Sequence, residues 1–246
     1  MKQLGLIGHT LGHSFSAKYF AEKFEREGLS EEFSYRLFEL PDIGDVEDLI
    51  AENSNLIGFN VTIPYKEQII PYLDDLSDEA REIGAVNCVK ILSDGHRVGY
   101  NTDVDGIRLT LDRLLDGEKI DSALVLGSGG ASKAVKFVLG ERGIECVVVS
   151  RNSTSGDITY DELSQEVIAA NRLIINASPV GTFPNVDAAP ALPYHLLTSE
   201  HRLFDLVYNP NLTLFMKRGT ERDARVVSGI DMLYAQAESA WRIWNE

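Results

Sequence analysis

The glycine-rich segment Gly127-Ser128-Gly129-Gly130-Ala131 joins an apolar run, residues 124–126, to a stretch with helical spacing. A loop of this kind presents backbone N–H groups at a helix N-terminus, where the helix dipole also favours phosphate. Glycine is needed because a Cβ would hold a diphosphate away from the backbone. The segment is therefore a variant of the dinucleotide-binding fingerprint. About half of the chain precedes it, and that half must serve another purpose.

A pair of serines, Ser14 and Ser16, follows a strand-like run and precedes a helix-like one. In that position the two hydroxyls could bind a small anion at the start of the helix. The simpler interpretation is that one serine only caps the helix. The segment alone favours capping.

Polar residues also interrupt the apolar run around residue 60. Asn60 and Thr62 alternate, so both face the same side of a strand. Pro64 ends that strand and places Lys66 at its carboxyl end, where open α/β sheets bind ligands. A lysine after a proline is usually a solvated surface residue, but the two polar residues that lead to it favour a functional role.

Two further segments carry polar residues among apolar neighbours. Asn87 interrupts an apolar strand, and its amide either satisfies neighbouring backbone or contacts a ligand. Asn101 could cap the next helix, with Asp103 in its first turn near the positive end of the dipole. Ordinary capping would explain this second pair.

The elements that must position these residues alternate between strand and helix spacing, which is typical of a mostly parallel sheet covered by helices. Before residue 101 we expect strands at 3–7, 33–40, 56–63 and 85–92, and helices at 16–27, 46–52 and 65–73. A helix at 102–115 leads into the second half. There we expect strands at 122–126, 145–150, 172–177, 203–207 and 225–227, with helices at 131–142, 160–170 and 232–244.

Composition narrows the function classes. The net charge of −15 and the pI near 4.7 argue against nucleic acid and anionic membranes as partners. Any anionic ligand must be held by local donors against this field. Cys88 and Cys146 lie in apolar runs, which fits buried thiols in a reducing compartment better than disulfides or a zinc site. No secretory signal or long apolar span is visible, so we expect a cytoplasmic protein.

Seven short segments of the chain, in the order in which they occur, resemble those of the shikimate dehydrogenase family, which includes shikimate and quinate dehydrogenases. Each motif alone is a weak signal, but together they cover nearly the whole chain. The motifs are His13-Ser14-Phe15-Ser16, Asn60-Val61-Thr62-Ile63-Pro64-Tyr65-Lys66, Gly84-Ala85-Val86-Asn87, Asn101-Thr102-Asp103-Val104-Asp105-Gly106, the glycine loop, Asp205-Leu206-Val207-Tyr208-Asn209-Pro210 and Gly229-Ile230-Asp231-Met232-Leu233-Tyr234-Ala235-Gln236.

The resemblance implies a role for individual residues. Lys66 and Asp103 would be the catalytic pair beside a substrate carbonyl. The substrate's carboxylate and hydroxyls would be held by Ser14, Ser16, Thr62, Asn87, Tyr208 and Gln236. The cofactor would be lined by Gly127, Ser128, Gly129, Gly130, Ala131, Leu206 and Gly229, and approached by Asp78.

The resemblance also implies a fold and a reaction. The fold would be two α/β domains flanking a groove: a substrate-binding domain at 1–100, joined by the C-terminal helix 230–246, and a Rossmann-like NADP-binding domain at 101–229. The reaction would be the NADP-dependent reduction of 3-dehydroshikimate to shikimate, in aromatic amino acid and chorismate biosynthesis. Quinate or another polyol acid is an alternative substrate, and a non-catalytic ligand sensor is an alternative class. Partners would be a small-molecule substrate and no nucleic acid or membrane, and the protein would be a monomer or homodimer.

Cofactor choice can be argued from the residues after the second strand of the second half. NAD-selective sites usually place an acid there, and that carboxylate would repel a 2′-phosphate. Here the strand runs into Ser150, Arg151 and Asn152, with Ser153 as a further donor and no acid before Asp157. Arginine can pair with the phosphate, so we expect NADP. The family usually shows Asn-Arg-Thr and a second basic residue here, whereas Arg151 is the only basic residue in this stretch. The preference for NADP over NAD is therefore expected to be smaller than is typical of the family.

Overall fold

The computed structural model describes residues 1–12 and 14–246. Packing divides the chain into two compact units. The first comprises Met1–Thr102 and Ala237–Glu246, and the second comprises Asp103–Gln236. The last helix is therefore shared between the units, and each unit is described by itself.

The sheet of the first unit is mixed and its described strands follow the order β2-β1-β3-β5-β6-β4. β1 pairs in parallel with β2 and β3, and β4 with β6, while β5 runs antiparallel to both of its neighbours. The strands are β1 (Lys2–Gly8), β2 (Phe33–Glu39), β3 (Leu56–Val61), β4 (Asp75–Leu76), β5 (Cys88–Ile91) and β6 (Arg97–Tyr100).

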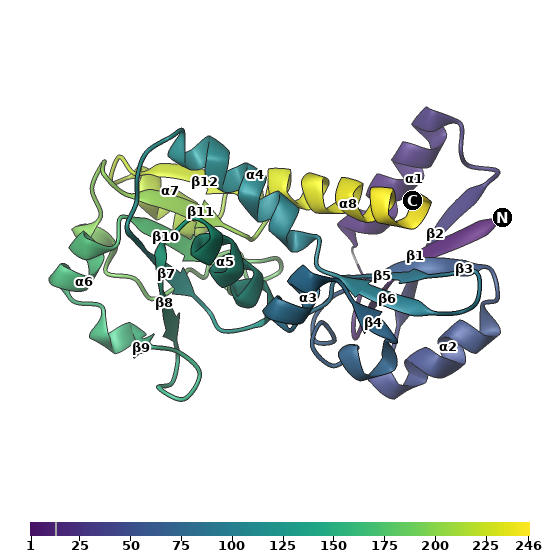
Figure 1. Cartoon of the computed structure of the whole chain (residues 1–246). Helices are drawn as coiled ribbons and strands as arrows, with labels where there is room; N and C mark the ends of the chain where they lie inside the picture. The colour runs from purple at the N-terminus through teal and green to yellow at the C-terminus, as the bar shows by residue number, and fades with distance from the viewer. Residues whose placement is uncertain (13) are drawn as a thin grey trace. The chain divides into compact units, whose positions relative to one another are not determined.

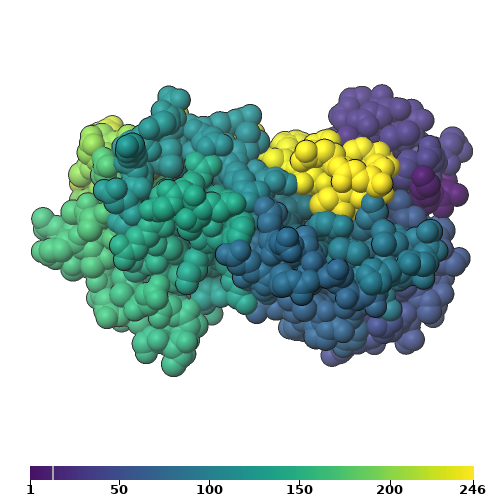
Figure 2. Space-filling model, viewed as in Figure 1, coloured from purple at the N-terminus to yellow at the C-terminus, as the bar shows by residue number. Residues whose placement is uncertain are grey.

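Helices cover both faces of this first sheet (Figure 1). The helices are α1 (Phe15–Glu27), α2 (Val46–Glu52), α3 (Asp78–Ile83) and the end of α8 (Ile230–Asn245). α1 and the end of α8 share one core, in which Phe20 contacts Trp244 and Phe24 contacts Trp241. Figure 2 shows the atoms of the C-terminal segment lying directly against those of α1. The other face packs on Phe59, Tyr65 and Ile69 beside α2.

Buried ionic contacts also join α8 to α1. The Lys23 ammonium is buried, pairs with Glu27 at 2.9 Å and with Glu238 at 3.0 Å, and lies over the Trp241 ring. The Tyr19 phenol also donates to Glu238. Burial of a lysine is tolerated only when it is paired in this way, so these contacts fix the C-terminal residues on the first unit.

The sheet of the second unit is entirely parallel, with its described strands in the order β12-β11-β10-β7-β8-β9. If the strands of this unit are numbered 1 to 6 along the chain, their order read from β9 is 3-2-1-4-5-6, which is the Rossmann strand order. The strands are β7 (Ser122–Leu126), β8 (Glu145–Ser150), β9 (Ile158–Thr159), β10 (Leu173–Asn176), β11 (Arg202–Asp205) and β12 (Arg225–Ser228). The helices are α4 (Asp103–Leu115), α5 (Gly130–Glu141), α6 (Gln165–Ala170) and α7 (Leu214–Thr220).

The two α/β sheets confirm the expected fold class, but some elements differ from the sequence prediction. The helix expected at 65–73 is wrong: turns lead to one 3₁₀ turn at Ile70–Tyr72, where Pro71 removes a backbone donor. The helix expected at 160–170 is interrupted, because Ser164 caps α6 anew by accepting from the Val167 amide. The elements α3, β4, β6 and α7 were not expected.

Candidate functional site

The predicted substrate residues of the first unit gather at one edge of its sheet, the edge formed by the ends of the strands rather than by an outer strand. β1 and β3 are parallel and end there, and the antiparallel β5 begins there. Helix α1 follows β1, so its N-terminus also lies at this edge. A shallow hollow at the same edge is lined by His9, Thr10, Thr62, Ile63 and Pro64.

The two serines have different surroundings. Ser14 is the N-cap of α1, and its Oγ accepts from the Ala17 amide at 3.5 Å. This bond uses a lone pair of the oxygen, so the hydroxyl hydrogen can still serve an anion. Ser16 lies in the first turn of α1 and is half-buried. His13 of the same motif lies outside the described residues.

Thr62 and Lys66 are fixed by the turn that follows β3. Thr62 donates its amide to the Ile7 carbonyl at 2.9 Å, and its own carbonyl accepts from the Tyr65 amide. The Tyr65 phenol is buried and donates to the Leu40 carbonyl at 2.6 Å. Lys66 follows directly, and its carbonyl accepts from the Val86 amide at 2.7 Å. The lysine is therefore a half-buried residue on an anchored turn rather than a freely solvated one.

Asn87 is buried and lies one residue before β5, not inside a strand as expected. Its Oδ1 accepts from the Thr102 amide at 2.7 Å and from the Thr102 hydroxyl at 3.1 Å. The Asn87 oxygen therefore satisfies neighbouring backbone, which is one of the two roles considered for it. The preceding residue, Val86, donates its amide to the Lys66 carbonyl, and this bond ties the Asn87 segment to the turn of Lys66.

The glycine loop of the second unit has the geometry that a diphosphate needs. Gly127 follows β7 with φ of +113°, a conformation that residues with a Cβ rarely adopt. Gly129 is the N-cap of α5, and within the described part of the chain no side chain caps it. The described atoms leave open space where a Cβ on Gly129 would stand. The exposed amides at this helix start fit the phosphates of a dinucleotide.

The loop after β8 is organised by its own hydroxyls. Ser150 donates to the Asn152 carbonyl, and the Asn152 side-chain oxygen accepts from Thr154 at 2.9 Å and Ser155 at 2.5 Å. The first acid, Asp157, accepts from the Val148 amide at 2.8 Å. Its carboxylate is therefore engaged with the strand backbone.

Arg151 is exposed on this loop. Burial raises the pKa of the Tyr160 phenol, and the positive charge of Arg151 offsets part of that rise. The loop therefore offers a guanidinium and hydroxyl groups to a ligand, which fits the 2′-phosphate of NADP.

The loops after β10 and β11 are joined by a buried carboxylate. Asp205 accepts from the Asn176 amide at 2.9 Å, the Val207 backbone at 3.0 Å and the Thr213 hydroxyl at 2.5 Å. Burial nevertheless raises its pKa to about 6. These bonds fix the chain at Leu206, the first residue after β11.

Gly229 and Leu206 are in close approach, since a Cβ on Gly229 would stand 2.4 Å from the Leu206 carbonyl oxygen. Only glycine fits there without a backbone shift. Tyr208 is exposed on the same loop as Leu206, and the side chain of Gln236 donates to the Leu233 carbonyl at 3.1 Å within α8.

The remaining predicted residues fall in both units. Asp103 is the first residue of α4 and belongs to the second unit, with Tyr208 and Gln236. Asp78 begins α3, is exposed and belongs to the first unit. The structure thus brings together Ser14, Ser16, Thr62, Lys66 and Asn87 within one unit.

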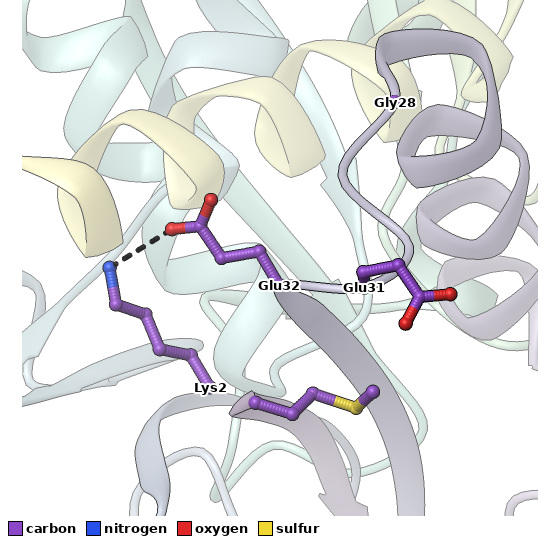
Figure 3. Close-up of a pocket in the computed structure, with 5 residues that line it drawn as sticks. Lys2, Gly28, Glu31 and Glu32 are labelled. Atoms are coloured by element: carbon purple, nitrogen blue, oxygen red, sulfur yellow. Dashed lines mark hydrogen bonds and ion pairs between the residues drawn. The ribbon is translucent and has the colours of Figure 1, made fainter.

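Three further features of the described residues were compared with these sites: a second hollow, possible metal ligands and possible membrane-spanning helices. A second hollow, at the amino ends of β1 and β2, is lined by Met1, Lys2, Gly28, Glu31 and Glu32 (Figure 3). Its Lys2–Glu32 ion pair, at 3.4 Å, has both side chains more than half exposed. The described residues hold no cluster of histidine, cysteine or carboxylate that could bind a metal ion. Within residues 1–12 and 14–246, none of the helices has the length and apolar character needed to cross a bilayer.

Comparison with known proteins agrees with this organisation. Residues 6–89 match the family of the shikimate dehydrogenase substrate binding domain. The shikimate dehydrogenase (NADP(+)) of Clostridium beijerinckii is 39% identical and aligns over 100% of this chain and 93% of its own. The Thermus thermophilus shikimate 5-dehydrogenase, solved with NADP(H) and shikimate, is 34% identical with a TM-score of 0.84, covering 99% and 93% of the two chains.

A quinate dehydrogenase from Corynebacterium glutamicum, solved in complex with NAD, is also similar. It is 27% identical with a TM-score of 0.88, covering 99% of this chain and 93% of its own. With full-length similarity to curated relatives above 30% identity and both α/β units in place, this chain belongs to the shikimate dehydrogenase family.

Proposed function

We propose that this protein is an NADP-dependent oxidoreductase that reversibly reduces 3-dehydroshikimate to shikimate, a step of aromatic amino acid and chorismate biosynthesis. The observation that carries the proposal is the full-length similarity to shikimate dehydrogenases that use NADP(+). Two further features support it: the predicted substrate residues cluster at one edge of the first sheet, and the exposed amides of the glycine loop fit phosphate groups.

Within the first unit, Ser14 and Ser16 would bind the substrate carboxylate. Neutral hydroxyl donors suit this task, because the overall charge of the protein is strongly negative. Thr62 and Asn87 would hold the substrate's hydroxyls, together with Tyr208 and Gln236 from the second unit. Lys66, on its anchored turn, would stand beside the substrate carbonyl.

Lys66 and Asp103 are proposed as the catalytic pair. Reduction of a ketone leaves an alkoxide, which needs a proton and a nearby positive charge. The Lys66 ammonium can supply both. The Asp103 carboxylate would orient the ammonium and tune its proton affinity. In the reverse direction the lysine amine accepts the hydroxyl proton.

NADP fits the residues of the second unit. When bound, the cofactor supplies the hydride, and the protein supplies position. The diphosphate would lie at Gly127, Ser128, Gly129, Gly130 and Ala131, and the 2′-phosphate at Ser150, Arg151 and Asn152. Leu206 and Gly229 would line the cofactor. The proposed approach of Asp78 remains a prediction.

Quinate with NAD is the alternative combination, and the similarity to the Corynebacterium glutamicum enzyme is the reason to test it. A ligand sensor without catalysis is disfavoured, because both Lys66 and Asp103 are present. We also propose that the enzyme works in the cytoplasm as a monomer or homodimer. Cys88 and Cys146 are both free thiols.

Steady-state assays with shikimate and quinate, each with NADP and NAD, test the proposal. We expect the highest kcat/KM for shikimate with NADP. A higher value for quinate with NAD would assign the alternative, and no turnover in any combination would assign the sensor class.

A further inference from the structure

The side chain of Asn176 bonds to three points of the turn that follows β10. Its Oδ1 accepts from the Ser178 amide at 3.1 Å and from the Ser178 hydroxyl at 2.7 Å, and its Nδ2 donates to the Val180 carbonyl at 3.3 Å. The Val180 amide in turn donates to the Ser178 hydroxyl oxygen at 3.3 Å. Pro179, between them, has no N–H. Because the amides of Ser178 and Val180 both donate to side chains, the shape of this turn depends on Asn176.

The orientation of the Asn176 amide is set by the carboxylate of Asp205. The two residues are register partners on β10 and β11, and both are fully buried. The Asn176 Nδ2 donates to Asp205 Oδ1 at 2.9 Å. An ionised carboxylate only accepts hydrogen bonds, so a flipped amide would bring two oxygens into contact. The Asn176 oxygen must therefore face the turn, where the two Ser178 donors meet it.

The turn that Asn176 holds packs against the first glycine of the glycine loop. A Cβ on Gly127 would stand 3.2 Å from both the backbone nitrogen and the Cβ of Ser178. The Ala177 amide donates to the Leu126 carbonyl at 3.0 Å, so the turn and the loop leave neighbouring parallel strands side by side. All of these residues belong to the second unit. The turn therefore supports the loop whose amides face the proposed diphosphate.

We propose that Asn176 is a positioning residue for the cofactor diphosphate, acting through Ser178 and the packing of the turn on Gly127. The Asn176 side chain already makes four hydrogen bonds, two from its nitrogen and two to its oxygen, which is the capacity of a carboxamide. It therefore serves the loop and does not itself bind the cofactor. The inference rests on the proposed function, because it assumes a dinucleotide at the glycine loop.

Asn176→Ala tests the inference, because it removes all of these bonds and releases the turn. We expect the dissociation constants for NADP and for NAD, measured by calorimetry, to rise by the same factor, roughly 3- to 10-fold, the range of one net hydrogen bond. The factor is shared because both cofactors carry the diphosphate. With cofactor saturating, kcat and the KM for shikimate should change by less than about twofold.

The matched control is Asn171→Ala, at the other end of β10. Asn171 is also buried, and its side chain donates to the Val167 carbonyl at 2.8 Å at the end of α6. Cofactors bind at the carboxyl ends of the strands in such sheets, whereas Asn171 precedes the amino end of β10. The control variant should lower the free energy of unfolding without changing either dissociation constant.

Ser178→Ala keeps the inference testable if Asn176→Ala does not fold. It removes one half-buried hydroxyl and leaves the Ser178 amide bonded to Asn176. Both dissociation constants should again rise by the same factor, up to about threefold. In the double variant the rise should be smaller than the product of the two single rises, because both changes remove the bond between Asn176 and the Ser178 hydroxyl.

Three results would overturn the inference. They are unchanged dissociation constants in a folded Asn176→Ala, or in Ser178→Ala where the former does not fold; a rise for NADP alone; and single effects that multiply fully in the double variant. Each can occur while the wild-type enzyme turns over shikimate with NADP. Conversely, a wild type that binds NADP without turning over shikimate would reject the proposed function and leave this inference standing.

Discussion

The side-chain oxygen of Asn87 accepts both the amide and the hydroxyl of Thr102, at 2.7 Å and 3.1 Å. Thr102 immediately precedes Asp103, the residue proposed to pair with the catalytic lysine. A single buried amide therefore fixes the backbone at the point where the first unit ends. Asn87 thus has a structural duty in addition to the substrate contact proposed for it.

Asn87→Ala should lower stability as well as substrate affinity. The change leaves the Thr102 amide without its acceptor, and an unsatisfied buried donor costs about 1–3 kcal/mol. Chemical denaturation measures the loss. The control is Asn55→Ala, which removes an exposed bond to the Met1 carbonyl and should cost well under about 1 kcal/mol. Equal losses for the two variants would contradict this account.

Asp205 should make stability depend on pH. Burial raises its pKa from 3.8 to about 6, so the folded state binds a proton more tightly than the unfolded state. The stabilisation is complete below pH 3.8 and is lost as pH rises through about 6, with an upper size of about 3 kcal/mol. The difference in unfolding free energy between wild type and Asp205→Asn should therefore fall between pH 4 and 6.5 and then level off. A difference that stays constant across this range would show that the Asp205 pKa is not raised.

Capping and substrate binding by Ser14 can be separated with two substitutions. Ser14→Ala removes the cap of α1 and should cost about 1 kcal/mol of stability while raising the KM for shikimate. Ser14→Asp keeps an acceptor for the Ala17 amide, so stability should be retained. Its negative charge opposes the substrate carboxylate, so the KM should rise further. If Ser14→Asp binds shikimate as wild type does, Ser14 is only a helix cap.

Arg151 should carry the preference for NADP. Arg151→Ala removes a charge-assisted contact worth about 1.5–3 kcal/mol, or roughly a 10- to 100-fold loss in kcat/KM for NADP. The value for NAD, which lacks the 2′-phosphate, should change little. Arg142→Ala is a suitable control in the same unit, since Arg142 pairs with Asp112 at 2.8 Å. A wild type that uses both cofactors equally, or an Arg151→Ala variant that keeps NADP use, would refute the assignment.

The sequence predicted the long elements and the motif positions because these depend on local signals. Apolar periodicity located α1, α2 and α4, and glycine located the turn after β7. Short elements such as α3 and β4 carry too few residues to show a period. The hydrogen bond from the Tyr35 phenol to Asn60 was not predictable, because the two residues lie on strands separated by β1 and only the strand order brings them together.

The polar atoms of the site show the same limit. The sequence left two roles open for Asn87, and only the fold shows that Thr102 approaches its oxygen. The orientation of Asp157 toward the Val148 amide is likewise a product of the β8–β9 turn rather than of any motif. Residue types could be placed from the sequence, whereas the direction of each donor and acceptor required the tertiary structure.

The most direct measurement is the turnover of shikimate with NADP by Lys66→Ala and Asp103→Asn beside wild type. We expect kcat to fall by about two to four orders of magnitude for Lys66→Ala, with shikimate binding changed far less. Asp103→Asn should also slow turnover, and the exposed Lys18→Ala should match wild type. Near-normal turnover in Lys66→Ala would contradict the proposed mechanism, and an effect of Asp103→Asn on thermal stability alone would reduce Asp103 to a helix cap.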